Sequence, residues 1–367
     1  MIRRLAFLAV TVLVLFSQVA VASPVFTPAT APYSFVFPRD YYAHDSYRTE
    51  WWYFTGHLRA ADGHLFGYEL TFFRAALRPV PYRVAPGKSA WRSAQLYPAH
   101  FAISDITAHA FDHHEILARD ALGQGYASQH RLDVKAFTWS LTGNGTREPT
   151  MHLRANDHGD AIDLTVKAMK PVAIHGRDGI SKKGACKTCA SHYFSFTRLA
   201  TSGVLVRGGK RYVVSGMSWM DHEYGSDELS PSQAGWDWFS IQLNDGRDIM
   251  LYRLREKNGT TTRESSGSLI SVSGRVRYLA RRDFRIEQTR TWVSPHTHGR
   301  YPSAWTLHIA GITRPLDLIP QLADQELADA LGTSYWEGAV IVRDGRTHAT
   351  IGVGYVELTG YAGTLRL

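Results

Sequence analysis

The sequence predicts an all-β fold built of antiparallel sheets that close into barrels. Short, aromatic-rich apolar runs recur along the chain, and turn-forming pairs such as Asp62-Gly63 and Asp245-Gly246 separate several of them. An Asp-Gly pair between two such runs indicates a hairpin, because the turn needs positive φ angles that glycine adopts without strain. Apolar residues rarely show helical spacing. Barrels are expected because closure removes exposed sheet edges.

The expected strands follow one another through most of the chain. Residues 51–58 and 65–73 form the first hairpin, around Asp62-Gly63. The further strand runs, most of them bounded by turn residues, are residues 99–110, 131–141, 150–153, 162–169, 204–206, 212–214, 238–243, 249–255, 339–342 and 349–356. The chain is therefore expected to be a succession of hairpins with short connections.

One short helix is expected in the C-terminal half. Apolar residues between positions 316 and 331 have roughly helical spacing, and Gly332 is a plausible helix end. Pro320 interrupts the pattern, so the better helix spans residues 324–331.

The first 22 residues have the composition of a secretory signal peptide. Arg3 and Arg4 precede an apolar run at residues 5–16, and Ala20-Val21-Ala22 supplies small residues for cleavage after Ala22. The run of 12 residues is shorter than the roughly 20 residues that span a bilayer. The mature protein is therefore expected in the periplasm or outside the cell.

The mature chain is expected to contain two domains. Residues 227–234 include Ser230-Pro231-Ser232-Gln233, which has the composition of a linker. This places the N-terminal domain at residues 23–226 and the C-terminal domain at residues 227–367.

Charge and motif content argue against several classes of function. Without residues 1–22, 39 basic and 33 acidic residues remain, and the basic ones are scattered. This distribution argues against nucleic-acid binding and allows at most a peripheral membrane contact. The sequence has no glycine-rich phosphate loop and no Gly-x-Ser-x-Gly motif, which argues against nucleotide binding and an α/β-hydrolase. No cofactor is expected.

The stretch from Ser218 to Gly225 is the strongest candidate for a reactive site. It places Asp221, His222 and Glu223 next to one another between aromatic residues, after a strand-like run and before the predicted linker. Two interpretations remain open: a chemical site between two β-rich halves, or a tight corner where the two acids accept backbone hydrogen bonds.

Glu50 and the tryptophans that follow it form a second candidate. Glu50 resembles a buried carboxylate that needs a partner, and Arg74 from the neighbouring strand can supply it. The pair is either structural or grips a polar head group. Trp51 and Trp52 are predicted ligand-binding residues. They point to opposite faces of their strand, so one lines a barrel interior and the other packs between sheets.

Cys186 and Cys189 are the only cysteines. In an oxidising compartment a local disulfide is the simplest interpretation. A zinc site with His175 and His192, or a redox Cys-x-x-Cys motif, is an alternative.

The histidines, chiefly His113-His114 and His296-Thr297-His298, are interpreted as solvated loop residues. No metal site is expected.

Six ordered motifs make the chain resemble the AttH/carotenoid 1,2-hydratase-like family. They are Glu50-Trp51-Trp52-Tyr53-Phe54-Thr55-Gly56-His57-Leu58, Phe72-Phe73-Arg74, Ala99-His100-Phe101-Ala102-Ile103-Ser104-Asp105, Trp219-Met220-Asp221-His222-Glu223-Tyr224-Gly225, Gly235-Trp236-Asp237-Trp238-Phe239 and Tyr335-Trp336-Glu337-Gly338. The resemblance implies two lipocalin-like β-barrel domains in tandem. Some relatives hydrate the terminal double bond of acyclic carotenoids, fungal relatives catalyse cycloadditions on polyenes, and many secreted bacterial members are described as hydrolases or accompany an ABC-type export system.

Hydration of an alkene requires a proton donor and a surface that stabilises a carbocation. A carboxyl group with a raised pKa can donate the proton, and aromatic faces can stabilise the cation. Asp221 is the predicted acid, with His222 or Glu223 as its partner. The predicted walls of the site are Trp219, Tyr224, Trp236 and Trp238.

The sequence thus predicts an exported lipocalin-like protein that binds an extended hydrophobic molecule, a polyene, isoprenoid or lipid, and hydrates a double bond as a hydro-lyase. The alternatives are a non-catalytic carrier that works with an ABC-type transporter, and a secreted hydrolase. A carrier needs only an open apolar barrel, whereas the enzyme needs Asp221 at a closed cavity with a perturbed pKa.

Overall fold

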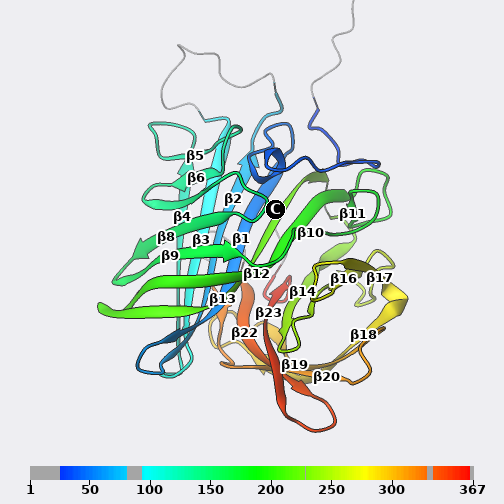
Figure 1. Ribbon diagram of the computed structural model, residues 1–367. Coiled ribbons are helices and arrows are strands. Elements are labelled where there is room, and N and C mark those ends of the chain that lie inside the picture. Colours follow the sequence, from blue (N-terminus) through cyan, green and yellow to red (C-terminus); the bar gives the residue numbers. More distant parts are fainter. Residues whose placement is uncertain (1–24, 81–92, 228, 329–333, 364–367) are drawn as a thin grey trace, which may run out of the picture.

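The computed structural model describes residues 25–80, 93–227, 229–328 and 334–363, and strands dominate these ranges (Figure 1). The predicted signal peptide and its cleavage site lie outside them. Two 3₁₀ turns, η1 (Arg39–Tyr41) and η2 (Arg281–Asp283), are the only helical elements of the described chain. Among these residues, no helix has the length and apolar character needed to cross a membrane.

The first sheet has 13 strands. They are β1 (Thr49–Ala60), β2 (Leu65–Ala76), β3 (Gln95–Asp105), β4 (Ala110–Arg119), β5 (Gly125–Ala127), β6 (Asp133–Ala136), β7 (Trp139–Gly143), β8 (Thr150–Asp157), β9 (Asp160–Ala168), β10 (Ala173–Ile174), β11 (Ser181–Lys182), β12 (Ala190–Arg207) and β13 (Lys210–Asp227). The order is β4-β3-β2-β1-β13-β12-β9-β8-β7-β6-β5, with β10 and β11 paired to β12. The edge strands β4 and β5 contact each other, so the sheet forms a nearly closed barrel.

The second sheet has 10 strands and forms a half-barrel. They are β14 (Gln233–Leu243), β15 (Asp248–Glu256), β16 (Ser266–Ile270), β17 (Val276–Ala280), β18 (Phe284–Val293), β19 (Arg300–Ile309), β20 (Leu316–Pro320), β21 (Glu326–Leu327), β22 (Tyr335–Asp344) and β23 (Thr350–Thr359). The order is β17-β16-β15-β14-β23-β22-β20-β19-β18, with β21 paired to β22. The all-β, lipocalin-like fold predicted from the sequence is confirmed, although the second barrel is only half complete.

The predicted hairpins follow from turn chemistry. β1 and β2 pair in register across the turn that contains Gly63, which has a φ of 90°. β12 and β13, each 18 residues long, are joined by Gly208 and Gly209, both with positive φ. Glycine at these positions lets each chain reverse without strain.

Three expectations are corrected by the structure. The strand expected at residues 99–110 ends with β3 at Asp105, and β4 begins at Ala110. Residues 316–320 form strand β20 rather than the start of a helix, because Leu316 and Leu318 are buried while Asp317 between them is half-buried, which is a period of two. Of the preferred helix, Glu326–Leu327 is strand β21 and residues 329–331 lie outside the described ranges. The single strand expected at 131–141 is two strands, since Phe137 has a φ of 50° and turns the chain between β6 and β7.

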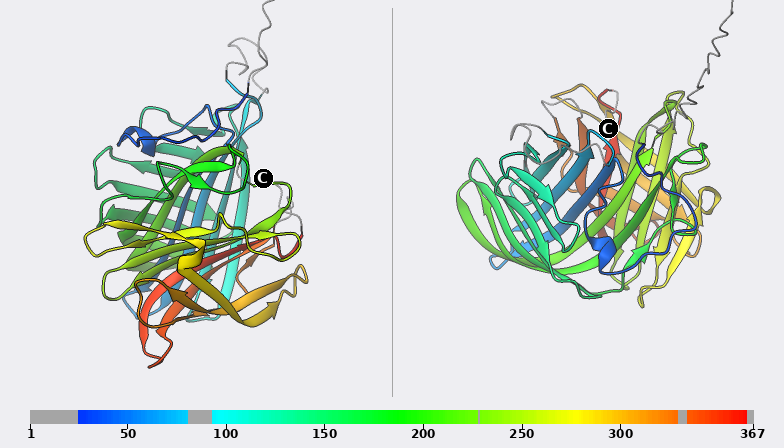
Figure 2. Two further views of the ribbon diagram at one scale, coloured as in Figure 1. Left: turned by 90° about the vertical axis from the view of Figure 1, so that its right-hand side faces the viewer. Right: turned by 90° about the horizontal axis from the view of Figure 1, so that it is seen from above.

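The two sheets lie side by side, and the outer face of the first packs on the second (Figure 2). Apolar side chains that include Trp52 and Phe54 fill the interior of the first barrel. A separate, aromatic-rich cluster, which includes Tyr53, Tyr193 and Trp238, lies between the sheets. Space for a ligand is therefore expected between the sheets and not inside the first barrel.

Candidate functional site

A cavity of about 360 Å³ lies between the two sheets. Strands β1 to β4, β12 and β13 of the first sheet supply one wall, and β14, β15, β22 and β23 of the second supply the other. Apolar residues such as Phe73, Leu117 and Leu254 line it together with tryptophans and tyrosines, and several carboxyl groups also face it. This combination of apolar walls with a few convergent polar groups is typical of a small-molecule site.

Asp221 on β13 lies in the wall of this cavity and is buried. Its Oδ2 accepts a hydrogen bond of 2.6 Å from the Tyr193 hydroxyl, and its Oδ1 accepts one of 2.6 Å from Trp219 Nε1 and another from the Ser195 hydroxyl. Burial raises the pKa of Asp221 from 3.8 to about 7, although the three donors oppose the rise. Asp221 therefore carries a proton over much of the range below neutral pH.

Further hydrogen bonds hold the residues that donate to Asp221 in place. His175 is fully buried, and burial lowers its pKa to about 3, so the ring is neutral. Because the Ser195 hydroxyl donates its hydrogen to Asp221, its oxygen accepts a hydrogen bond of 2.6 Å from His175 Nε2, and Ser268 donates to His175 Nδ1 at 2.9 Å. On the other side, Trp238 Nε1 donates to the Tyr193 oxygen at 2.9 Å. The carboxyl group is held in one orientation.

Glu223 lies two residues further along the same face of β13 and pairs with Lys183. The Lys183 Nζ is 2.7 Å from Glu223 Oε1 and lies over the rings of Tyr193 and Tyr252. Ser191 also donates to this carboxylate. Glu223 is thus an ion-paired carboxylate beside Asp221, and not a free acid.

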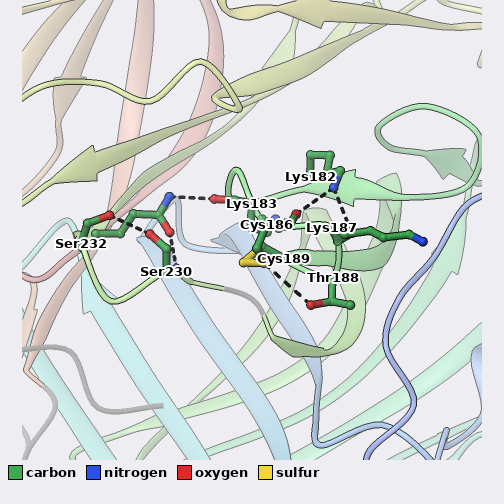
Figure 3. The surroundings of a disulfide bond; sticks show 9 residues. Lys182, Lys183, Cys186, Lys187, Thr188, Cys189, Ser230 and Ser232 are labelled. Carbon is green, nitrogen blue, oxygen red and sulfur yellow. Dashed lines mark hydrogen bonds between the residues drawn. A yellow bond between two sulfur atoms is a disulfide. The ribbon is translucent and has the colours of Figure 1, made fainter.

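The loop that carries Lys183 is closed by a disulfide between Cys186 and Cys189 (Figure 3). The backbone N–H of Lys183 donates to the Cys189 carbonyl at 2.9 Å, and its own carbonyl accepts from Gln233 Nε2 at 2.7 Å. Gln233 begins β14, so this loop also joins the first sheet to the second. The disulfide resolves the alternatives left open for the two cysteines.

The second sheet brings two further carboxyl groups to the cavity. Glu337 on β22 and Glu357 on β23 are direct cross-strand partners. Tyr53 donates to Glu337 Oε1 at 2.9 Å, and Trp236 Nε1 donates to Glu357 Oε2 at 3.0 Å. Burial, with the nearby charge of Glu357, raises the pKa of Glu337 well above 4.5. Burial also raises the pKa of Glu357 to about 7, against the hydrogen bond from Trp236.

His222 points away from Asp221, because neighbouring residues of a strand face opposite sides of the sheet. Its ring is buried in the first barrel, stacked on Trp52 with ring centroids 4.8 Å apart. Tyr224 also faces this side and stacks on His44 at 3.6 Å. The structure therefore does not pair His222 with Asp221 as predicted. It also places Tyr224 and Trp52 outside the cavity, although the sequence predicts ligand contacts for both.

Glu50 and Arg74 form the predicted ion pair, directly across β1 and β2. The Arg74 Nε lies 2.9 Å from Glu50 Oε2, and Glu50 Oε1 contacts His44 Nδ1 at 2.8 Å and His222 Nε2 at 2.9 Å. Burial alone would raise the pKa of Glu50, but Arg74 and the two histidines hold it well below 4.5. Both residues border the cavity, yet the ion pair is completely buried and anchors the barrel.

The other four tryptophans predicted for the ligand site lie on the cavity side. Trp51, Trp236 and Trp238 line the cavity, and Trp219 packs behind Asp221 in the same aromatic cluster. Trp51 and Trp52 divide between the two faces of β1 as strand alternation predicts.

The interpretation of residues 218–225 as a corner is wrong. The whole stretch lies inside β13, and Asp221 accepts its hydrogen bonds from side chains. Its environment is a cavity wall between two sheets.

Several residues of the site were missed from the sequence. Tyr193, Ser195 and Lys183 belong to segments without a recognised motif, whereas Glu337 lies inside one that was recognised. Alternation could have identified part of the set, since Trp51-x-Tyr53, Trp219-x-Asp221-x-Glu223 and Trp236-x-Trp238 each present one polar or aromatic face.

Two groups of residues in the described chain could hold a metal ion. One is His44 with Glu50 and His222, and the other is His114 with Asp157 and His158. In the first, Glu50 is already bound by Arg74 and both histidines. Neither group lines the cavity, apart from Glu50 at its border.

Comparison with known families decides the relationship of this chain. A family model described as AttH-like matches residues 28–361. The chain belongs to the AttH-like family. The crystal structure of an AttH protein from Nitrosomonas europaea is similar at a TM-score of 0.81 and 31% identity, covering 92% of this AttH-like chain and 100% of that one.

The fold is also shared with an enzyme. Kievitone hydratase from Nectria haematococca matches at a TM-score of 0.67 and 16% identity, covering 93% of this chain and 97% of that chain. At this identity the likeness concerns the fold alone. A comparison with curated proteins found no match.

Proposed function

We propose that this AttH-like protein binds a hydrophobic molecule in the cavity between its sheets and adds water to one of its double bonds, with Asp221 as the acid. The observation that carries the proposal is Asp221 itself. It is a buried carboxyl group in the wall of an aromatic-lined cavity, oriented by three donors, and its pKa is raised to about 7. A general acid works best when its pKa lies near the working pH.

The cavity suits the cation that protonation of an alkene creates. Trp51, Trp236 and Trp238 present aromatic faces to the cavity, and the carboxyl groups that line it favour a positively charged intermediate over a neutral ligand. Among the described residues that line the cavity there is one lysine, Lys183, and it is ion-paired with Glu223. The fold shared with kievitone hydratase supports a hydratase in the general sense.

The apolar lining favours a ligand whose buried part is hydrocarbon. A terpene alcohol, an acyclic polyene and a prenylated phenol are suitable test compounds, because each carries a trisubstituted double bond that gives a tertiary cation. Steric fit then decides among them.

The test is to incubate the purified protein with these three alkenes and to measure the products by mass spectrometry. We expect at least one compound to gain the mass of one water with the wild-type protein and not with Asp221→Asn. Asp163→Asn, an exposed aspartate of β9, is the matched control and is expected to retain turnover.

Binding is measured separately by the fluorescence of cis-parinaric acid, a polyene fatty acid. We expect both variants to bind this probe. If the wild-type protein binds the probe and the alkenes but returns every alkene unchanged, the proposal is refuted and the protein is a carrier.

A further inference from the structure

The carboxyl pair on the second sheet includes a buried oxygen atom for which the described part of the chain provides no hydrogen-bond partner. Glu337 is almost completely buried, and its Oε2 has no hydrogen-bond partner among the residues that the structure describes. A buried polar atom without a partner is costly, because it loses its contacts with water and gains none in return. Since Glu337 lines the cavity, a polar ligand atom or water is the natural partner of Oε2.

Glu337 and Glu357 each accept one side-chain hydrogen bond, but they differ in how strongly their surroundings oppose ionisation. Trp236 donates a hydrogen bond to Glu357, which favours its ionised form. Glu337 has one oxygen held by the Tyr53 hydroxyl and lies directly across the ladder from Glu357. Burial and the nearby charges of Glu357 and Glu69 raise the pKa of Glu337 well above 4.5, whereas burial raises the pKa of Glu357 to about 7. Of the two cross-strand partners, Glu337 therefore keeps its proton and Glu357 ionises first.

Two aromatic residues, Tyr53 and Trp238, connect the carboxyl pair of the second sheet with Asp221 of the first. Tyr53 is the direct cross-strand partner of Asp221 on the first sheet, and its hydroxyl reaches Glu337 on the second. Trp238 is the direct cross-strand partner of Glu357, and its indole reaches Tyr193, which donates to Asp221. The cavity between the sheets thus has a carboxylic acid on one wall and a singly protonated carboxyl pair on the other.

We propose that Glu337 and Glu357 bind the water that attacks the substrate, with Glu357 accepting its proton. This inference rests on the proposed function. The protonated Glu337 donates a hydrogen bond to the water oxygen. This hydrogen bond stays on the lone pair that does not attack, or it breaks as the attack begins. The Glu357 carboxylate accepts a hydrogen bond from the water.

The steps balance as the addition of one water. Asp221 gives its proton to one carbon of the double bond, the π bond breaks, and the other carbon becomes a cation. The water oxygen forms a bond to this cation, and its proton passes to Glu357. Glu357 then loses the proton to solvent, and the Asp221 carboxylate takes one from solvent.

The test uses Glu357→Gln and an alkene that the wild-type protein hydrates, in deuterated water. Asp221 still protonates the alkene in this variant, and the cation returns to alkene by losing a proton. We expect hydration to fall by about 100-fold or more, the usual contribution of a general base, while deuterium still enters the recovered alkene. Asp221→Asn is expected to lose both reactions.

Two further variants complete the test. Glu287→Gln, on the exposed part of β18, is the matched control and should leave both reactions unchanged. Trp236→Phe removes the hydrogen bond to Glu357 and keeps an aromatic wall, so we expect a smaller loss of hydration with exchange retained. If Glu357→Gln does not fold, shown by loss of cis-parinaric acid binding, this variant carries the test.

The outcomes separate the two proposals. Hydration at the wild-type rate in Glu357→Gln, or in Trp236→Phe where that variant carries the test, overturns the role of the pair while the proposed function stands. Loss of deuterium exchange together with hydration in a variant that still binds cis-parinaric acid also overturns it. Absence of hydration in the wild-type protein overturns the proposed function itself.

Discussion

Replacing Asp221 by asparagine is expected to change the pH dependence of stability in a specific direction. The pKa of Asp221 is raised from 3.8 to about 7 in the folded protein, mainly by burial. Between these pH values the folded protein holds a proton that the unfolded chain has lost. The free energy of unfolding therefore falls as pH rises through this window, and it falls no further above about 7.

The size of the effect follows from the two pKa values. Each pH unit within the window costs about 1.4 kcal/mol, so ionisation of Asp221 removes at most about 4 kcal/mol of stability by pH 8. Asparagine cannot ionise and escapes this loss. With the amide oxygen of asparagine facing Ser195 and Trp219, its NH2 group takes the place of Oδ2 and cannot accept the hydrogen bond from Tyr193, which costs about 1 kcal/mol at every pH.

Urea unfolding of both proteins at pH 5 and pH 8 measures the difference. We expect the stability of Asp221→Asn relative to wild type to rise by about 2–3 kcal/mol between the two pH values. The exposed Asp163→Asn should show a change within about 0.5 kcal/mol. A relative stability of Asp221→Asn that does not change with pH would refute the reasoning, because Asp221 would then titrate in its ordinary range.

Two further predictions concern the residues that support the site. Arg74→Met leaves the buried Glu50 without its guanidinium, and we expect a loss of about 3–5 kcal/mol in urea unfolding; a loss below about 1 kcal/mol would show that the histidines suffice. Replacing both Cys186 and Cys189 by serine opens a loop of four residues, for which the chain-entropy model gives a loss of about 2 kcal/mol. Thermal unfolding measures this second loss, and a value well above it would mean that the disulfide also stabilises the folded loop.

The sequence predicts those parts of the fold that depend on local chemistry. The Asp-Gly and Gly-Gly turns locate the hairpins, because glycine at positive φ is needed there whatever the rest of the chain does. The recurrence of leucines from residue 316 onward predicts a helix there. Alternation with Asp317, which pairs into the sheet, identifies a strand instead.

The candidate site was predicted in part. The aromatic neighbours and the family motif identify Asp221, but they group His222 with it only because the two residues are adjacent in the sequence. Once the stretch is a strand, the two side chains must face opposite sides of the sheet. Glu337 and Glu357 could not be joined to Asp221, since more than a hundred positions separate them and only the packing of two sheets brings them together.

A crystal structure of Asp221→Asn with a bound alkene tests the central claim most directly. This variant is expected to bind an alkene that is a substrate of the wild-type protein and to leave that alkene unchanged. We expect the chain of the ligand along Trp51, Trp236 and Trp238, with a carbon of its double bond about 3–3.5 Å from the side chain at position 221, the distance of a reactive complex. An alkene inside the first barrel, or one with its double bond remote from position 221, would contradict the claim.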